Sequence, residues 1–410
     1  MFSPLIALME DQVTALKARG IRAEFINSTL NREQREERYA ALARGEYDLV
    51  YVTPERMYKR EFRAALEELE GGIKLLAVDE THCITKWGHD FRPAYKEVGR
   101  FRVELGSPVT IALTATATPA VRDDIRKTLD LDEDEMPLFA SGLDRPNLSF
   151  ESVTVWGDDE KVQWIEDVAR EAKGTGIVYF TLIKTLEHMA LEIGKRWGSK
   201  RIEIYHGKLA PEEKKRVYDR FTASRPEDQL ILLATNAFGM GVDKSDIRYI
   251  MHYQVPGSVE SYYQEVGRAG RDGLDSRCVL LYEEADLTIQ QEFVRWMNPS
   301  MDLLTDAANA FASTRHAELH VDDLRELITG RDRGDRRADY CAIALEKMGV
   351  LEAAATPELY RFSRRLQEGE LDGEELAAKR ERDLRRLLDM VELVRSDDIR
   401  QYVLDYFGLD

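Results

Sequence analysis

Short apolar runs alternate with charged, helix-prone stretches along the first part of the chain. Residues 49–52, 73–78 and 109–113 are mainly apolar runs, and residues 32–43, before the first of them, are a charged stretch. Short runs that are apolar throughout predict buried strands, whereas the charged stretches favour helices. Strands that alternate with helices predict a parallel sheet with helices on both faces.

The same alternation starts again after Arg145 and Pro146. The expected strands are residues 176–180, 201–205, 230–234, 249–252 and 278–282. Segments of helical length separate these runs, so a second lobe of the same α/β kind is expected. We therefore divide this part of the chain into a first lobe, residues 1–143, and a second lobe, residues 144–290.

Strand patterns largely disappear beyond about residue 286, where the sequence becomes helical and highly charged. The expected elements are two helices and a small hairpin, at residues 319–328, 335–348, 350–351 and 359–362. Their order suits a winged helix within residues 291–370. Residues 371–410 are expected to form a helical tail, with its main helix at residues 374–394.

Four arginines gather before and at the start of the second of these helices, at Arg331, Arg333, Arg336 and Arg337. A helix that reads DNA often carries basic residues at its start. The other interpretation is an ordinary solvated helix start with interleaved acids. The sequence leaves both open.

Composition narrows the class of protein. The 410 residues include 58 Lys plus Arg and 76 Asp plus Glu, a formal net charge of −18. No stretch approaches the roughly 20 apolar residues that cross a bilayer, and no basic segment with an apolar signal core opens the chain. We expect a cytoplasmic protein, associated with the nucleoid if it is bacterial, with no membrane partner.

The cysteines exclude two further classes. Cys83, Cys278 and Cys341 lie far apart, so they predict neither a disulfide framework nor a four-cysteine zinc site. His316 and His320 have helical spacing, but two histidines without further ligands are more often a solvated pair. We therefore expect no structural zinc.

Two adjacent acids follow the apolar run at residues 73–78. Ligands of parallel sheets bind at the carboxyl ends of the strands, which is where Asp79 and Glu80 would lie. In a nucleotide-hydrolysing site Asp79 would hold Mg²⁺ through its water shell, and Glu80 would orient the attacking water. The alternative is a strand end whose acids cap the following helix.

A second motif, residues 262–273, places Arg268 and Arg271 three residues apart among glycines. The permanently charged, forked guanidinium suits the spread-out charge of a phosphoryl group in transfer. An arginine from the second lobe would make hydrolysis depend on lobe closure. Taken as a lone motif, the segment could also be a salt-bridged helix.

Residues 79–95 resemble the DEAH motif and the aromatic-rich loop of RecQ-type superfamily 2 DNA helicases. Further segments resemble that family's motifs in order: residues 3–9 with 11–13 (motif Ia), 53–56 (Ib), 114–118 (III), 144–147 (the start of the second lobe), 205–209 (IVa), 234–244 (V) and 262–273 (VI). The resemblance implies two tandem RecA-like lobes. It also implies an ATP-dependent DNA helicase of 3′-to-5′ polarity that acts in repair or recombination on single strands and duplex junctions.

The resemblance also implies roles for individual residues. The catalytic residues would be Asp79, Glu80, His82, Arg268 and Arg271. ATP and Mg²⁺ would be bound by Asp79, Glu80, Gly241, Asp243, Gln264, Arg268 and Arg271. DNA would be bound by Ser3, Thr53, Trp87, Phe91, Arg92, Tyr95, His206 and Thr235, among which the aromatic side chains would supply stacking faces.

One expected motif is missing. The chain contains no G-x-x-x-x-G-K-[ST] phosphate loop, whose amides and lysine would cradle the β and γ phosphates. We expect this chain to bind ATP weakly and to hydrolyse it poorly, and the sheet of the first lobe to lack a central strand. A start at an internal methionine would explain this, and an ATP-independent DNA-binding or regulatory protein that keeps the helicase scaffold is the alternative.

The tail differs from the family as well. Residues 388–408 resemble the zinc subdomain of the RecQ-type helicases, but Asp398 stands where the first of its later cysteines would be. The tail must then pack through its apolar residues, such as Val403 and Phe407, instead of through a metal.

Overall fold

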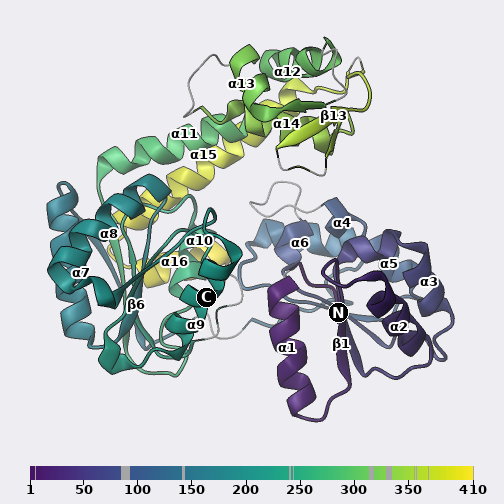
Figure 1. Cartoon of the computed structure of the whole chain (residues 1–410), viewed down its shortest axis with the longest axis horizontal. Coiled ribbons are helices and arrows are strands. Elements are labelled where there is room, and N and C mark those ends of the chain that lie inside the picture. Colours follow the sequence, from purple (N-terminus) through teal and green to yellow (C-terminus); the bar gives the residue numbers. More distant parts are fainter. Residues whose placement is uncertain are drawn as a thin grey trace.

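Two α/β lobes lie side by side, and two long helices carry a smaller unit away from the second lobe (Figure 1). The computed structural model describes all residues except 5, 85–92, 141–143, 240, 241, 243, 314–317, 329–334, 355, 357, 368 and 410. The interpretation of the sequence as two parallel-sheet lobes followed by a mainly helical region is confirmed.

The first lobe contains two parallel pairs of strands, which residues 1–3 join. The strands are β1 (Ala23–Ile26), β2 (Leu49–Val52), β3 (Leu75–Val78) and β4 (Val109–Ala112). β1 pairs with β2, and β3 pairs with β4. Phe2 makes parallel bridges to both Val52 and Val78, so the first residues lie between β2 and β3.

The outer edge of β4 has no partner strand within the described residues. Val109 and Ile111 on β4 are 73% and 44% exposed, although parallel strands are usually covered on both faces. The first lobe therefore presents an open, apolar strand next to the acid-bearing strand β3.

Six helices accompany these strands: α1 (Ile6–Ala18), α2 (Arg32–Ala43), α3 (Arg60–Glu67), α4 (Pro93–Lys96), α5 (Val98–Glu104) and α6 (Pro119–Leu129). The side chain of Asn31 caps α2 and Gln34 returns the bond to the Asn31 backbone, which explains why the helix begins there. α6 begins with Thr118 as its cap and Pro119 as its first residue.

A six-stranded parallel sheet forms the second lobe. In order across the sheet, the strands are β5 (Leu148–Thr154), β10 (Ser276–Tyr282), β9 (Ile247–His252), β6 (Thr175–Tyr179), β8 (Ile231–Ala234) and β7 (Ile202–Tyr205). The five strands expected from the sequence are confirmed to within two residues at each end.

Helices cover both faces of this sheet (Figure 1). They are α7 (Asp158–Ala172), α8 (Ile183–Trp197), α9 (Pro211–Ala223) and α10 (Val259–Val266). One core lies between the sheet and α7 and α8. The other core also contains Leu393, Val403 and Phe407 from the end of the chain. The tail thus packs through apolar residues as expected, and the structure adds that it packs onto the second lobe.

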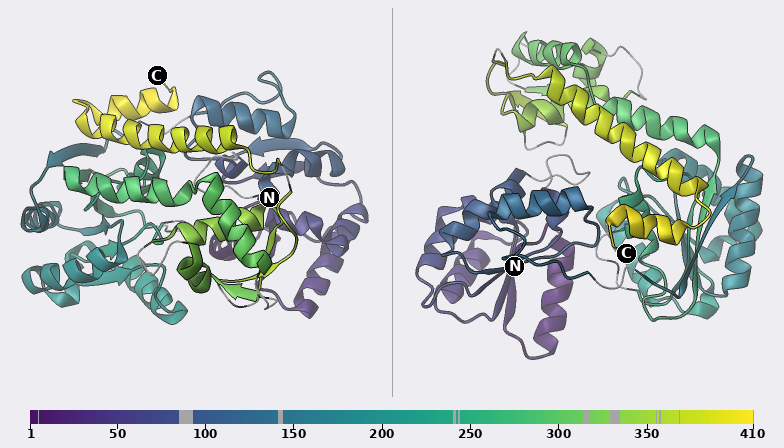
Figure 2. Two further views of the ribbon diagram at one scale, coloured as in Figure 1. Left: turned by 90° about the horizontal axis from the view of Figure 1, so that it is seen from above. Right: turned by 180° about the vertical axis from the view of Figure 1, so that it is seen from behind.

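The helices α11 (Leu287–Met297) and α15 (Gly373–Arg395) lie side by side and form an arm (Figure 2). The side chains of Asn298 and Lys379 both donate hydrogen bonds to the Asp383 carboxylate where the arm meets the outer unit. The chain returns along α15 and ends in α16 (Ile399–Phe407), which packs on the second lobe with its C-terminal end toward the first lobe.

The outer unit at the end of the arm has a core of its own. Its elements are α12 (Met301–Ser313), β11 (Glu318–His320), α13 (Val321–Ile328), α14 (Arg337–Lys347), β12 (Leu351–Ala353) and β13 (Leu359–Phe362). The expected order of two helices and a hairpin is present, and the short strand β11 completes an antiparallel sheet of order β11-β13-β12.

Within the described part of the chain, no helix has the length and apolar character needed to cross a membrane.

Candidate functional site

The acids of the DEAH-like motif lie at the carboxyl end of β3, as predicted. The carboxylate of Asp79 accepts hydrogen bonds from the Ser3 hydroxyl, at 3.1 Å, and from the Glu80 amide, at 3.0 Å. Glu80 has a positive φ of 49°, a left-handed conformation that is uncommon for a residue other than glycine. Such conformations persist only where the surrounding structure holds them in place, and they cluster at functional sites.

His82 connects this strand end to the next one. Its Nδ1 lies 3.0 Å from the Thr114 hydroxyl and 3.3 Å from a carboxylate oxygen of Glu80. Thr81, which stands where the family has alanine, is fully buried, and its hydroxyl donates to the Leu113 carbonyl at 3.0 Å. The larger side chain is therefore accommodated without an unpaired polar atom.

Both arginines of the second-lobe motif lie in the turn that follows α10. Arg271 donates to the Val242 carbonyl at 2.9 Å. Arg268 is 8% exposed and lies against Gly239, where an added Cβ would be 3.1 Å from its Nη2. Burial raises the pKa of the nearby Tyr179 hydroxyl, and the Arg268 charge only partly offsets this. Both arginines are thus held by the backbone or core of their own lobe.

One cleft between the lobes, of about 710 Å³, brings the two motifs together. Its lining includes Glu80 and Thr114 from the first lobe and Gln264, Arg268 and Arg271 from the second. Gln264 donates from its amide to the Thr116 hydroxyl across the cleft, at 3.2 Å. A carboxylate and two guanidinium groups that line one cavity, with a second carboxylate next to the first in the sequence, are suited to a polyphosphate ligand and its metal ion.

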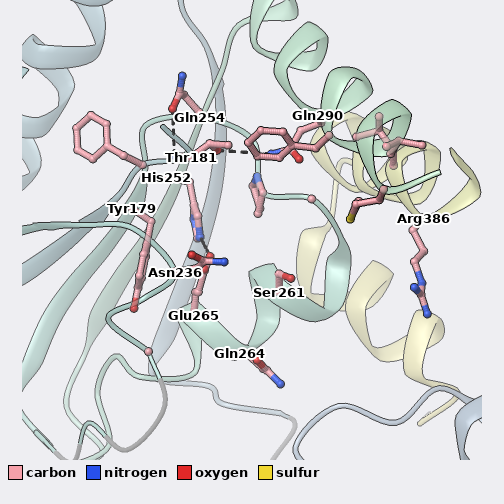
Figure 3. A pocket seen from close by; sticks show the side chains of 18 of the residues that line it. Tyr179, Thr181, Asn236, His252, Gln254, Ser261, Gln264, Glu265, Gln290 and Arg386 are labelled. Carbon is pink, nitrogen blue, oxygen red and sulfur yellow. Dashed lines mark hydrogen bonds and ion pairs between the residues drawn. The ribbon is translucent and has the colours of Figure 1, made fainter. Parts of the chain in front are cut away.

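A second cavity, of about 520 Å³, lies on the other side of α10, below the arm (Figure 3). Gln254 and Gln290 converge there on Thr181, while Arg386 reaches in from α15. His252, on β9, is paired with Glu265 of α10 at 2.7 Å. Gln264 and Arg268 line both cavities, so α10 separates the cleft from a polar space below the arm.

The expected DNA contacts of four side chains are not supported. Ser3 is 1% exposed and bonded to Asp79, and Tyr95 is fully buried and donates to the Asp79 carbonyl at 2.9 Å. His206 and Thr235 are 5% and 6% exposed, and His206 lies 3.4 Å from Glu187. Tyr95 is therefore a core residue in this structure, a position that does not support its expected stacking on a base. Its place two residues after Pro93 gave no sign that the chain turns inward there.

Other expected site residues lie at the edge of the described structure or outside it. Thr53 is half-buried at the end of β2 and precedes a 3₁₀ turn. Gly241, Asp243, Trp87, Phe91 and Arg92 lie outside the described residues.

The arginines expected on the winged helix are only partly described, since Arg331 and Arg333 fall outside. Arg336 is paired with Asp339 at 2.9 Å, and Arg337 with Asp335 at 2.5 Å. These two guanidinium groups are therefore bound by carboxylates of the same unit, which supports the solvated helix start over the DNA-reading helix.

Three arginines of the cleft region were missed from the sequence. Arg145 and Arg122 line the cleft, and Arg400 of α16 contacts the segment that joins the lobes. The sequence pattern identifies residues 144–147 only as the start of the second lobe. Nothing in the local pattern of α16 indicated that it would return to this place.

The residues of the site fit Mg²⁺ and part of ATP. Asp79 and Glu80 offer the hard oxygen ligands that Mg²⁺ prefers, and the arginines offer phosphate donors. The lysine and glycine-rich cradle for the β and γ phosphates is absent from the sequence. The residues present thus fit the metal and the transferring phosphate, but not the whole nucleotide.

No group of three or more His, Cys, Asp or Glu side chains suited to a metal occurs among the described residues. Asp398 instead caps α16, because its carboxylate accepts the Gln401 amide at 3.0 Å.

Comparisons with known proteins agree with this geometry. A family model described as DEAD/DEAH box helicase matches residues 1–125, and one described as helicase conserved C-terminal domain matches residues 160–273. The ATP-dependent DNA helicase RecQ of Bacillus subtilis is 43% identical over 71% of this chain and 48% of its own length. The probable ATP-dependent DNA helicase RecS of the same organism is 35% identical over 99% of this chain and 76% of its own length.

The chain thus spans about half the length of the first relative and about three quarters of the second. Among solved structures, a crystal structure of the DUF1998 helicase MrfA bound to DNA matches 89% of this chain and 54% of its own, with a TM-score of 0.53 at 19% identity. This likeness concerns the fold alone. Together with the ordered motifs, the relatives show that the chain belongs to the RecQ-type superfamily 2 DNA helicases.

Proposed function

We propose that this protein is the motor of an ATP-dependent DNA helicase that moves in the 3′-to-5′ direction and serves DNA repair or recombination. The observation that carries the proposal is the single cleft that Glu80 lines from one lobe and Arg268 and Arg271 from the other. Both relatives named above are described as ATP-dependent DNA helicases or probable ones, which supports the same activity.

Each residue has a stated task in this proposal. Asp79 would hold Mg²⁺ through water, and Glu80 would orient the water that attacks the terminal phosphate. Arg271 would meet the developing charge from the second lobe, and Arg268 would support it. Because the groups come from different lobes, hydrolysis would occur only when the lobes close. Gly241 and Asp243 are proposed to contact the nucleotide on the resemblance alone.

DNA would bind through the aromatic-rich loop. The side chains proposed for this are Trp87, Phe91 and Arg92, with Thr53 at the end of β2. Aromatic faces with interleaved cations suit a single strand, because every base offers a face for stacking. Their link to the cleft would run through His82, which contacts both Glu80 and Thr114.

The test compares ATP hydrolysis with and without single-stranded DNA in two proteins. The first is the chain itself, for which we expect little turnover because no phosphate loop is present. The second is a chimera in which a strand–G-x-x-x-x-G-K-[ST] loop–helix segment of a RecQ-type helicase precedes Met1. We expect DNA-stimulated hydrolysis in the chimera.

Glu80→Gln or Arg271→Ala should then reduce that turnover at least about 100-fold, the order of effect seen when a group that acts in the transition state is removed. Matched controls are Glu36→Gln on α2 and Arg295→Ala on α11, both in surface ion pairs. They should leave the rate unchanged. Undiminished turnover in either cleft variant would overturn the assignment.

A further inference from the structure

The short segment that joins the two lobes is attached to the turn that carries the arginines. The guanidinium of Arg145 donates to the carbonyls of Ala269, at 2.9 Å, and Gly270, at 2.7 Å. Asn147 donates from its amide to the Gly270 and Leu274 carbonyls, both at 2.9 Å. Arg145 also donates to the Gly267 carbonyl, at 3.5 Å, so the two side chains of the joining segment bind the turn through five hydrogen bonds.

Gly270 permits this close approach. It has a positive φ of 54°, and an added Cβ would lie 2.5 Å from the Asn147 amide nitrogen and 2.8 Å from the Leu274 carbonyl oxygen. Any larger residue would displace the turn from the joining segment. The glycine between Arg268 and Arg271 thus serves the contact with Asn147.

The same joining segment is held on its other side by α16. The Arg400 guanidinium donates to the Asp144 carboxylate at 2.7 Å, to the Arg145 carbonyl at 3.0 Å, and to the Leu148 carbonyl. It also lies 5.2 Å from the centre of the Phe150 ring. A planar fork with several fixed donors can hold three acceptors at once, which a lysine cannot do with the same geometry.

The far end of α16 contacts both lobes. Tyr406 donates to Glu260 of α10 at 2.9 Å, and the Phe407 ring lies 5.4 Å from the Tyr263 ring. From the first lobe, Arg122 donates to the Phe407 carbonyl. α16 therefore touches the helix that precedes the arginine turn, the joining segment and the first lobe.

We infer that Arg400 is a positioning residue for the arginine motif. It fixes the joining segment, which through Arg145 and Asn147 fixes the turn at residues 267–271, so that lobe closure moves Arg268 and Arg271 as one body with α16. The inference rests on the proposed function, because it concerns the placement of the same arginines. It gives α16 a task that does not need a metal.

The first test is hydrogen exchange on the full chain without nucleotide. The amides of Gly270 and Asp272 are bonded to the Ile247 and Ser245 carbonyls, so they report directly on the turn. Arg400→Ala should speed exchange in residues 267–274 at least about tenfold while leaving the outer unit on the arm unchanged. Arg400→Lys should restore only part of the protection. The matched control is Arg385→Ala on α15. Arg385 forms an ion pair with Asp389, and its side chain is 65% exposed.

Unchanged protection of the turn in Arg400→Ala would overturn the inference. So would faster exchange throughout the chain, because that is what a general loss of stability produces. Arg145→Lys keeps the charge but removes the fork, and it provides a second variant should Arg400→Ala not fold. It should loosen residues 267–274 alone, and a uniform effect would again contradict the positioning role.

The second test uses the chimera described above. Arg400→Ala should lower kcat about tenfold with little change in the KM for ATP, because the residue does not touch the nucleotide. A loosened turn with unchanged kcat would overturn the positioning role. Absence of hydrolysis in the unsubstituted chimera would overturn the proposed function alone, since the exchange result does not depend on ATP.

Discussion

Glu80 carries both the carboxylate proposed to orient the attacking water and an unusual backbone conformation. Its left-handed backbone places it beside Asp79, whose carboxylate accepts the Glu80 amide. A strained backbone of this kind costs about 1–3 kcal/mol, which the surrounding contacts must supply. The buried Ser3 hydroxyl supplies one such contact by donating to Asp79. Ser3 was expected to bind DNA, and it supports the acid site instead.

Residue identity indicated the chemistry of the site better than it indicated exposure. Glu80, Arg268 and Arg271 were assigned from their residue types and spacing, and all three line one cleft. Tyr95 and His206 are buried although the sequence pattern favours exposed side chains there, because whether a side chain lies inside or outside depends on contacts far away in the sequence. Tyr95 lies in the core of the first lobe, where its hydroxyl donates to the Asp79 carbonyl.

Cys278 predicts a measurable dependence of stability on pH. Burial raises the pKa of its thiol from 9.0 to about 12. Above pH 9 the unfolded chain loses this proton while the folded chain keeps it, so the unfolded state binds fewer protons and stability falls as the pH rises. Between pH 8 and pH 10 the thiol should lower the free energy of unfolding by about 1.4 kcal/mol.

Urea unfolding at these two pH values checks this prediction. From pH 8 to pH 10, the free energy of unfolding of Cys278→Ala should fall by about 1.4 kcal/mol less than that of the unsubstituted protein. Val178→Ala, a truncation in the same buried sheet without an ionisable group, should keep the original dependence. Equal dependence in all three proteins would contradict the assignment to Cys278.

At the scale of elements, apolar runs predicted most strands of the two lobes, including β4, which the structure leaves partly exposed. The expected strand at residues 49–52 coincides with β2, and β6 and β8 are buried along their whole length. β5 and β1 were missed because their sequences mix polar and apolar residues, as in Ser149, Glu151 and Glu24. β5 is an edge strand, where one side needs no apolar cover.

The crossing of α5 and α6 depends on one glycine. A Cβ added at Gly99 of α5 would lie 1.8 Å from the Thr128 carbonyl oxygen of α6. Gly99→Ala should therefore force the helices apart and lower the free energy of unfolding by about 1–3 kcal/mol. Denaturant unfolding measures this change.

Gly373 provides the matched control, since it begins α15 and has no atom within 4 Å of an added Cβ. Gly373→Ala should change stability by less than about 0.5 kcal/mol. An equal effect of both substitutions would show that the α5–α6 contact is not limiting.

For the whole molecule, the path of the chain after the second lobe could not be predicted. The helices α11 and α15 are separated by the whole outer unit, yet they lie side by side. Returning the chain along α15 brings Arg400 to Asp144, 256 residues away in the sequence. Local patterns carry no information on a contact of such separation, so the role of α16 emerged only from the structure.

The net charge of −18 describes the whole molecule and does not describe the cleft. An overall acidic protein can bind a polyanion where cations gather locally. Here Arg122, Arg145, Arg268 and Arg271 gather at the cleft. Overall charge therefore does not argue against ATP or DNA as ligands.

Strand displacement by the chimera tests the central claim most directly. The substrate is a duplex with a single-stranded tail at either the 3′ or the 5′ end, and the separated strand is measured with and without ATP. We predict ATP-dependent separation of the 3′-tailed duplex only, and none after Glu80→Gln. Separation that needs a 5′ tail, or that persists in Glu80→Gln, would contradict the account.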